Sequence, residues 1–356
     1  PQRQPDHAGR VNMSRQQAVE AALEGRRRLV NDAIGEDLPI DEPERLYEAS
    51  RYLLEAGGKR LRPTILLLAA ESLADIEPQS GNYREFPATD GSAIDIMAAA
   101  VSIEIIQSFT LIHDDIMDDD DMRRGVPAVH REYDLSTAIL AGDTLYSKAF
   151  ENMLETGAPA ERSVRALSEL ATTCTEICEG QSLDIEFEKR AAVTPDEYLE
   201  MVELKTAVLY AAAASIPAVL LGYDDAVDPL HSYGLDVGRA FQIQDDLLDL
   251  TTPTEKLGKQ RGSDLVEGKR TIITVHARDQ GVDIDTLVDA ESVEEVTEAE
   301  IDEAVARLEE VGSIEYARST AQRLVDSGKS HLQTLPENEA HDLLDDIADY
   351  LIEREY

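Results

Sequence analysis

Basic residues are scarce in this chain. Lys and Arg number 33 against 73 Asp and Glu, so the formal net charge is −40 over 356 residues. A nucleic-acid partner requires a basic footprint, and an anionic membrane surface attracts basic segments. We therefore expect no nucleic-acid partner and no stable membrane insertion. The acid excess is spread along the whole chain and repels itself unless salt screens it. This predicts a salt-rich, halophilic cytoplasm; an ordinary acidic protein is the alternative.

Cysteine is also rare, and a long apolar segment is missing. Cys174 and Cys178 are the only cysteines, and their i, i+4 spacing predicts a buried pair of thiols rather than a metal or redox site. The low count fits a reducing compartment. The N-terminal residues carry no apolar core typical of a signal peptide. The longest apolar run, near Val208–Tyr223, is too short to span a bilayer. It predicts a buried core helix in a cytoplasmic protein.

Strand-like alternation is absent, whereas apolar residues recur at helical spacing almost everywhere. We expect residues 1–14 to be disordered and 15–356 to form one helical domain. Segments 75–92 and 279–300 are expected as acidic surface insertions. No linker or short-period repeat divides the chain, so the prediction is an all-α bundle around a central cavity. The expected helices are 15–35, 43–57, 61–75, 92–117, 135–156, 160–189, 195–222, 226–250, 270–280, 297–311, 314–329 and 338–354.

Two copies of one acidic pattern, DDxxD, stand out against this helical background. On a helix the first and last Asp of each copy lie on one face, one turn apart. Three carboxylates that close repel one another, and Mg²⁺, which takes oxygen ligands, supplies the counter-charge. One copy could be a solvated acidic face, but two copies beside apolar residues favour a site for two to three Mg²⁺ ions that hold a diphosphate. The expected ligands are Asp114, Asp115, Asp118, Asp245, Asp246 and Asp249.

The few basic residues gather in three places. The segment Gly57–Pro63 joins two glycines and three cations at a helix start, where the backbone favours an anion, although the glycines could simply cap a helix. Arg123 and Arg124 follow the first motif, where charge compensation is the alternative. Lysines and arginines crowd the loop after the second motif, which indicates a lid over phosphates. The cations of that loop are Lys256, Lys259, Arg261, Lys269 and Arg270.

Polar stripes on apolar helices point to the same cavity. Gln107 and Thr110 share a helical face with the first motif, and Gln242 shares one with the second. Lys205 and Thr206 interrupt an otherwise apolar helix. A polar stripe must face something polar, and a central cavity meets that need. A surface position is the alternative for Lys205 and Thr206.

Together these motifs resemble the trans-polyprenyl diphosphate synthases, the family of farnesyl and geranylgeranyl diphosphate synthases. The resemblance runs from Gly57 to Lys269, with GGKRLRP, LIHDDIMD, EGQSLD, KT and FQIQDDLLD in the family's order. It implies the isoprenoid synthase fold, a homodimer, and isopentenyl and allylic diphosphates as substrates. Terpene cyclases and squalene or phytoene synthases do not need the GGKRLRP segment. A non-catalytic subunit of such an enzyme is a further alternative, although such proteins usually lose an Asp motif.

The resemblance also implies residue roles. Lys59 and Arg62, with Arg60 nearby, would bind the isopentenyl diphosphate. Arg123 would contact the allylic diphosphate and Arg124 the isopentenyl one. Gln107, where many prokaryotic members have His, would hydrogen-bond a diphosphate, and Lys259 and Lys269 would close over the site with Asp264 beside them. The residues expected to line the reaction centre, or to stabilise the allylic cation, are Gln181, Lys205, Thr206 and Gln242.

Product length is the last expectation from the resemblance. Archaeal geranylgeranyl synthases carry an aromatic residue five positions before the first motif and none at the fourth. Phe109 and Thr110 match that pattern. Phe109 would close the floor of the elongation tunnel, which predicts trans-geranylgeranyl diphosphate as the product. Packing of Phe109 between helices, and a farnesyl or bifunctional farnesyl/geranylgeranyl synthase, remain alternatives.

Overall fold

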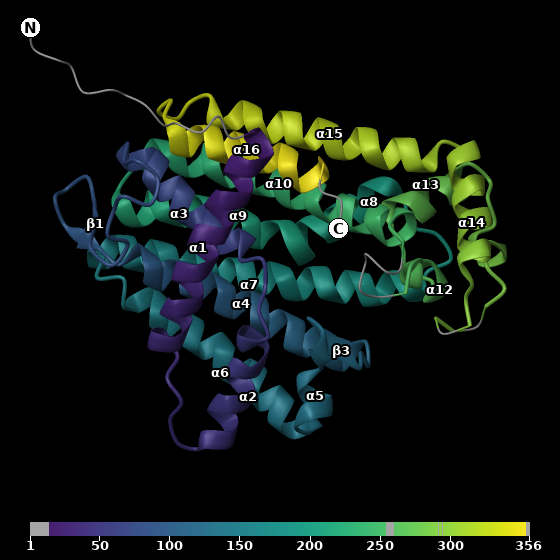
Figure 1. The fold of residues 1–356 in the computed structure, drawn as a ribbon, viewed down its shortest axis with the longest axis horizontal. Coiled ribbons are helices and arrows are strands. Elements are labelled where there is room, and N and C mark those ends of the chain that lie inside the picture. Colours follow the sequence, from purple (N-terminus) through teal and green to yellow (C-terminus); the bar gives the residue numbers. More distant parts are fainter. Residues whose placement is uncertain (1–13, 254–259, 291, 294, 354–356) are drawn as a thin grey trace, which may run out of the picture.

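The computed structural model describes residues 14–253, 260–290, 292–293 and 295–353, and this part of the chain is almost entirely helical (Figure 1). The predicted all-α fold is confirmed, and the predicted helices are present with ends shifted by a few residues. The helices are α1 Arg15–Asp37, α2 Glu44–Glu55, α3 Leu61–Ala74, α4 Ile96–Met117, α5 Val129–Glu132, α6 Leu135–Leu154, α7 Ala160–Lys189, α8 Pro195–Val202, η1 Glu203–Ala207, α9 Val208–Leu221, α10 Asp224–Thr251, α12 Ser263–Val266, α13 Ile272–Asp279, η2 Ile284–Thr286, α14 Glu298–Glu310, α15 Ser313–Leu332 and α16 Glu339–Glu353.

Two short antiparallel hairpins interrupt the helices. Strand β1 (Phe86–Pro87) pairs with β2 (Ala93–Ile94), and β3 (Met122–Arg123) pairs with β4 (Val126–Pro127). Two-residue strands are too short to show an alternating pattern, so the sequence did not predict them. In the β3–β4 hairpin, Arg124 (φ 53°) and Gly125 (φ 78°) form the turn. Positive φ at both central residues matches the backbone twist of paired strands.

Helix α9 lies in the middle of the bundle. All of its residues are buried, and it packs against α3, α4, α7 and α10. The predicted core helix is therefore confirmed. Among the described residues, Ile96–Met117 and Pro195–Leu221 are long and apolar enough to cross a membrane, but 78% and 83% of their apolar windows are buried in the fold. Helix α15 lies along α10 and closes one long edge of the molecule (Figure 1).

The two segments expected as surface insertions are mostly exposed or half-buried, and each also sends a few side chains into the core. Tyr83 and Phe86 are buried, and the Tyr83 hydroxyl donates a hydrogen bond to Glu71 on α3. Glu71 is itself fully buried and pairs with Arg26 of α1. In the second segment Val282, Ile284 and Val296 are buried. Of the N-terminal residues expected to be disordered, 1–13 lie outside the described part, and Ser14 caps α1.

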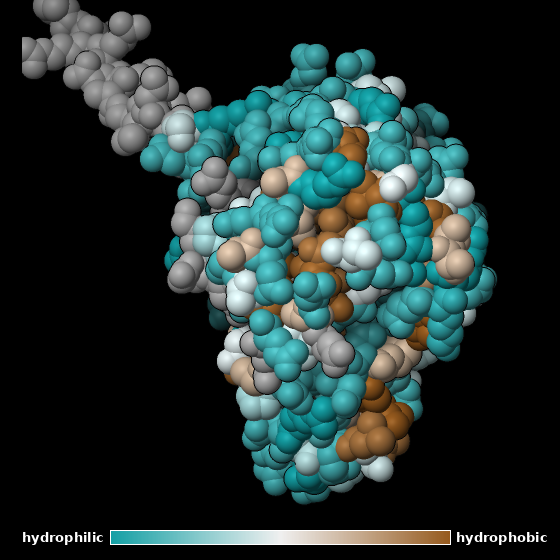
Figure 2. Space-filling view, turned by 90° about the vertical axis from the view of Figure 1, so that its right-hand side faces the viewer, coloured by the Kyte–Doolittle hydropathy of each residue, from teal (hydrophilic) through white to brown (hydrophobic). Residues whose placement is uncertain are grey.

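The surface is hydrophilic on the face shown in Figure 2, as the net charge requires. Apolar surface there is confined mainly to a central crevice and to a patch at the lower end, the end where Figure 1 places α2, α5 and α6. Large exposed apolar side chains on α6 are Leu135, Ile139, Leu140, Tyr146 and Leu154.

Candidate active site

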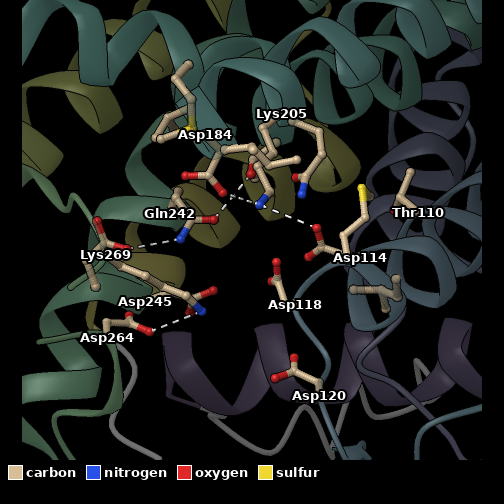
Figure 3. Close-up of a pocket in the computed structure, with 18 of the residues that line it drawn as sticks. Thr110, Asp114, Asp118, Asp120, Asp184, Lys205, Gln242, Asp245, Asp264 and Lys269 are labelled. Atoms are coloured by element: carbon tan, nitrogen blue, oxygen red, sulfur yellow. Dashed lines mark hydrogen bonds and ion pairs between the residues drawn. The ribbon is translucent and has the colours of Figure 1, made fainter. Parts of the chain in front are cut away.

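Both aspartate motifs line one cavity of about 970 Å³. Helix α4 contributes its C-terminal turns, α7 and the α8–η1 helix contribute the opposite wall, and α10 with residues 260–271 contributes the third side. In Figure 3, Asp114 and Asp118 point into the cavity from one side, and Asp245 and Asp264 from the other. The predicted facing of the two motifs across a cavity is therefore present in the fold.

The first motif does not use its three carboxylates alike. Asp114 and Asp118 line the cavity, whereas Asp115 is fully buried and accepts a hydrogen bond from Nε of Arg123 at 2.7 Å. Burial and the neighbouring Asp114 carboxylate raise the pKa of Asp118 to about 6. A cation held between Asp118 and Asp114 would favour the ionised form of both carboxylates. The predicted supporting role of Asp115 fits its contact with Arg123.

The second motif shows the same division. Asp245 and Asp246 both line the cavity, but Asp246 is almost fully buried and accepts hydrogen bonds from the Tyr198 hydroxyl and from Nε2 of Gln242, the latter at 3.1 Å. Burial raises the pKa of Asp246 well above its usual value. Its partners hold it against α8, so Asp246 supports the site from behind Asp245.

Asp249 departs from its prediction as a metal ligand. Its carboxylate is buried, does not line the cavity, and accepts hydrogen bonds from Ser263 Oγ at 3.0 Å and from the Asp264 backbone N–H at 3.2 Å. It therefore fastens the start of α12 to α10. The one-face spacing with Asp245 suggested a ligand, but the chain returns after α10 and covers that turn of the helix.

Lys205 and Thr206 lie on the cavity wall in η1, where the helix widens into a π-turn. Such turns are frequent at functional sites. The Lys205 Nζ atom is 2.6 Å from Asp184 and 3.5 Å from Asp114. Burial lowers its pKa, but these carboxylates more than offset it, and the net pKa is raised. The surface alternative for this pair is thereby excluded.

A glycine allows this wall to form. A Cβ atom on Gly180 of α7 would lie 2.2 Å from the Lys205 backbone nitrogen. Helix α7 and η1 therefore touch backbone to backbone, which brings Asp184 within reach of Lys205. The residue after Lys205, Thr206, donates a hydrogen bond to Oε1 of Gln242 at 3.2 Å. This bond leads on through Gln242 to Asp246.

Three donors on the cavity wall lack acceptors among the described residues, and one of them is Nε of Arg270. The Nε of Arg62 and the Nε2 of Gln181 are buried and have no hydrogen-bond partner among the described residues. Buried donors are nearly always paired, so these two mark a place for an anion or another polar ligand. The Arg62 guanidinium lies 4.1 Å over the Tyr210 ring, which fixes its position.

The remaining predicted residues are distributed as follows. Gln107, Phe109, Thr110, Arg123 and Lys269 line the cavity. Lys269 pairs with Glu267 at 3.1 Å and lies 3.9 Å from Asp264. Lys59 is exposed and does not line the cavity. Lys256 and Lys259 lie outside the described residues.

Arg60 and Arg124 do not line the cavity, contrary to their predicted contact with substrate. Both side chains are engaged by Glu104 of α4 and by backbone carbonyls of α2, because the loops that carry them fold back onto these helices. The cysteine prediction is half wrong: Cys174 is buried, but Cys178 is exposed on the cavity wall.

Phe109 lies below the first motif, between α4 and α6. The centre of its ring lies 5.2 Å from the centre of the His113 ring and 5.4 Å from that of the Tyr146 ring, and both contacts are edge to face. His113 in turn fills the space opposite Gly142, where a Cβ would lie 2.2 Å from its ring. Tyr146 was missed by the sequence analysis, because no local pattern connects it to residues on α4.

Carboxylate oxygens are the ligands that Mg²⁺ prefers, and Asp114, Asp118 and Asp245 present them from two sides of the cavity. Among the described residues no three His, Cys, Asp or Glu side chains are close enough to enclose an ion alone. Mg²⁺ usually binds through one or two carboxylates plus substrate phosphates and water. The three carboxylates, which leave room for phosphate and water ligands, fit that mode of binding.

The chain is similar to known proteins over almost its whole length. The polyprenyl synthetase family model matches residues 43–308. The chain is 71% identical to a geranylfarnesyl diphosphate synthase from Natronomonas pharaonis over 95% of this chain and 98% of the relative. It is 50% identical to a geranylgeranyl diphosphate synthase from Methanosarcina mazei over 92% of this chain and 95% of the relative.

A solved structure shows the same architecture. The geranylgeranyl pyrophosphate synthetase of Geoglobus acetivorans superposes with a TM-score of 0.82 at 44% identity, over 93% of this chain and 99% of that one. Both the sequence match and the shared fold extend over nearly the whole chain, including both aspartate motifs. This chain belongs to the polyprenyl synthetase family.

Proposed function

We propose that this protein is a prenyltransferase that condenses isopentenyl diphosphate with dimethylallyl, geranyl and farnesyl diphosphates to give trans-geranylgeranyl diphosphate. The observation that carries the proposal is the pair of aspartate motifs that face each other across one cavity with Arg62, Lys205 and Lys269 on its walls. A helical subunit without catalysis would have no need for both.

In this proposal, different residues bind the metal, the allylic diphosphate and isopentenyl diphosphate. Asp114, Asp118 and Asp245 would hold Mg²⁺, which when bound supplies positive charge to the departing diphosphate. Arg123, Lys205 and Lys269 add fixed cations around the same cavity. Arg62 and Gln181, whose donors lack partners, would take the diphosphate of isopentenyl diphosphate. These contacts orient the two substrates toward each other.

The reaction then proceeds as a substitution at carbon. The C–O bond of the allylic diphosphate breaks, the double bond of isopentenyl diphosphate forms the new C–C bond, and a proton leaves the adduct for the released diphosphate. Oxygen dipoles of Thr206 and Gln242, held to each other at 3.2 Å, would face the developing positive charge. Apolar cavity residues such as Phe241 exclude water, which would otherwise quench the cation.

A twenty-five-carbon product is the second candidate, because the relative with 71% identity is named a geranylfarnesyl synthase. The twenty-carbon proposal rests on Phe109, which is 9% exposed and held edge to face between His113 and Tyr146. A ring fixed by two aromatic contacts would close the space below Asp114.

The test is incorporation of radiolabelled isopentenyl diphosphate by the purified protein. Each allylic primer is supplied in turn with Mg²⁺ and molar KCl, and the products are sized by chromatography. Twenty-carbon product supports the proposal, and twenty-five-carbon product supports the second candidate. Consumption of the allylic primer without isopentenyl incorporation would indicate a cyclase, and no consumption of either would indicate a non-catalytic subunit.

We also propose a homodimer, with α6 at its interface. Leu135, Leu140 and Leu154 are each more than half exposed on this helix, and clustered exposed apolar residues are typical of interaction surfaces. Light scattering after size exclusion should give twice the chain mass, and the double variant Leu135→Lys, Leu140→Lys should run as a monomer. Wild type at the mass of one chain would exclude the dimer.

We further propose that the protein works in a salt-rich cytoplasm. The proposal is supported by the net charge of −40 and by two cysteines that form no disulfide. Fractionation of cells that express the tagged protein would place it, and recovery in the membrane pellet would contradict the proposal.

A further inference from the structure

A buried carboxylate on α4 joins two basic segments beside the cavity. Glu104 lies ten residues before Asp114 and is only 3% exposed. Its Oε1 atom accepts hydrogen bonds from Nη1 of Arg60 and, at 3.3 Å, from Nη2 of Arg124. Arg60 belongs to the loop before α3, and Arg124 to the β3–β4 turn. These segments are separated by more than sixty positions in the chain and meet at this one oxygen.

Both arginines stand at strained backbone positions. Arg60 has φ 51° and Arg124 has φ 53°, in the left-handed region that non-glycine residues rarely adopt. Such conformations persist only where the surroundings enforce them, and they gather at functional sites. Charge-assisted hydrogen bonds to a buried carboxylate are strong enough to do this. Glu104 therefore holds the side chains of both residues. At Arg60 its contact also favours the left-handed backbone, which at Arg124 the two-residue turn already requires.

The two arginines also make hydrogen bonds to residues of α1 and α2. Arg60 Nε donates to Oδ1 of Asn31 at 2.8 Å, and its Nη2 donates to the Leu54 carbonyl. Arg124 Nη1 donates to the Leu53 carbonyl at 3.0 Å. The guanidinium groups thus bind the last turn of α2, on which the loop to α3 begins. All of these contacts converge on the start of α3, where Arg62 stands.

Gly58 lies where the guanidinium groups meet. A Cβ atom at this position would lie 3.0 Å from Nη1 of Arg60 and 3.1 Å from Cζ of Arg124, and Gly58 has φ +152°. The loop thus packs directly on both side chains. Two guanidinium groups share the one carboxylate of Glu104, which leaves a positive charge unbalanced at the edge of the cavity. An anion bound by the neighbouring Lys59 and Arg62 would be attracted by that charge.

We propose that Glu104 is a positioning residue for the isopentenyl diphosphate site. It touches no substrate. It locks the loop before α3 and the β3–β4 hairpin together, so that Arg62, whose buried Nε lacks a partner on the cavity wall, is held in place to bind the second diphosphate. The inference rests on the proposed function, because it assigns this half of the cavity to isopentenyl diphosphate.

The test compares Glu104→Gln with Glu71→Gln. Glu71 is also a buried carboxylate that pairs with an arginine, but its partner Arg26 lies between α1 and α3, and neither residue lines the cavity. Steady-state KM is measured separately for isopentenyl diphosphate and for farnesyl diphosphate, with thermal unfolding followed by circular dichroism. Glu104→Gln should raise the KM for isopentenyl diphosphate about ten-fold or more and change that for the allylic substrate less than three-fold. Glu71→Gln should lower the melting temperature and leave both KM values unchanged.

Two more variants keep the outcome decisive. Glu104→Asp retains the charge with a shorter arm and should give a smaller rise in the same KM. In the double variant Glu104→Gln, Arg124→Gln, the rises in the KM for isopentenyl diphosphate should not be additive, because each substitution removes the same contact between Glu104 and Arg124. Equal changes in both KM values, an unchanged isopentenyl KM, or the same pattern in Glu71→Gln would overturn the inference. If Glu104→Gln does not fold, Glu104→Asp and Arg124→Gln decide by the same criteria. Failure of the wild type to incorporate isopentenyl diphosphate would instead contradict the proposed function.

Discussion

The hydroxyl of Tyr198 donates a hydrogen bond to the carboxylate of Asp246, and both side chains are buried. The contact ties α8 to the middle of the second aspartate motif. In the first motif Arg123 holds the middle residue, Asp115, in the same way. Each motif therefore presents its first carboxylate to the cavity and fastens its second to another part of the protein, although Asp246 also reaches the cavity wall. In each DDxxD motif of this chain, the hydrogen bonds of the second Asp fix the helix turn that carries the proposed metal ligands.

We expect the aspartates of the second motif to respond differently to substitution. Asp245→Ala should lower kcat at least a hundred-fold with little change in melting temperature, because a cavity-facing carboxylate that binds Mg²⁺ is lost. Asp249→Ala should mainly lower the melting temperature, because the hydrogen bonds to Ser263 and Asp264 are lost. Steady-state kinetics at saturating Mg²⁺ and thermal unfolding separate the two effects. Asp114→Ala should behave like Asp245→Ala, and near-normal turnover in either would contradict the metal assignment.

The helices and the facing of the motifs could be predicted from sequence because both depend on local spacing. The apolar period of 3.6 residues fixes each helix, and i, i+4 spacing places Asp114 and Asp118 on one side. The run Val208–Tyr223 was recognisable as core by its composition alone. The helix ends moved by only a few residues, since caps such as Asp134 and Thr194 are also local.

Contacts between distant segments could not be predicted in this way. Nothing near Tyr198 indicates that it meets Asp246, 48 positions later. Asp249 has the spacing of a ligand, and only the return of the chain at α12 shows that it is a cap. Arg60 lies in a basic segment that indicates an anion site, and only the fold shows that its guanidinium pairs with Glu104. Local pattern predicts which residue types gather, whereas tertiary packing decides which of them reach the cavity.

Stability should depend on pH through Glu169. This carboxylate lies between α7 and α9, accepts a hydrogen bond from Ser215, and burial raises its pKa to about 7. The folded state then holds a proton that the unfolded state releases near its ordinary value of 4.5. The stabilisation is fully present below that value and is lost as pH rises through about 7. From pH 5 to pH 8 the free energy of unfolding should fall by up to about 3 kcal/mol from this group.

Glu169→Gln should remove this part of the pH slope and be more stable than wild type at pH 8. Glu161→Gln is the control, because Glu161 is exposed on the same helix and its loss changes the net charge equally. Urea unfolding at pH 5, 6, 7 and 8 in constant salt measures the slopes. The same slope in wild type and Glu169→Gln would show that Glu169 does not titrate in this range.

Salt should stabilise the protein over a wide range. A net charge of −40 repels itself, and the Debye length falls from about 10 Å at 0.1 M to about 3 Å at 1 M. We expect the melting temperature to rise by more than 10 °C between 0.1 M and 2 M KCl, and turnover to rise with it. Calorimetry in KCl, with sorbitol of equal osmolality as the control, distinguishes screening from a general solute effect. A melting temperature indifferent to KCl would contradict a halophilic origin.

Product length should respond to the two residues below Asp114 in opposite directions. Phe109 is held between His113 and Tyr146, so Phe109→Ala should open the space toward α6 and lengthen the products beyond twenty carbons. Thr110 lines the cavity one turn before Asp114, and Thr110→Phe places a ring there, which should shorten the products toward fifteen carbons. Both are measured as the chain-length distribution from farnesyl or dimethylallyl diphosphate at equal turnover.

Tyr146→Ala provides the matched control for this floor. It removes one of the two rings that support Phe109 but leaves Phe109 itself in place. If Phe109 alone closes the tunnel, Tyr146→Ala should lengthen the products less than Phe109→Ala does. If Tyr146→Ala lengthens them equally, the floor is the pair of rings across α4 and α6. An unchanged product pattern in both Phe109→Ala and Thr110→Phe would remove these positions from control of chain length, and the twenty-carbon proposal would lose its support to the twenty-five-carbon alternative.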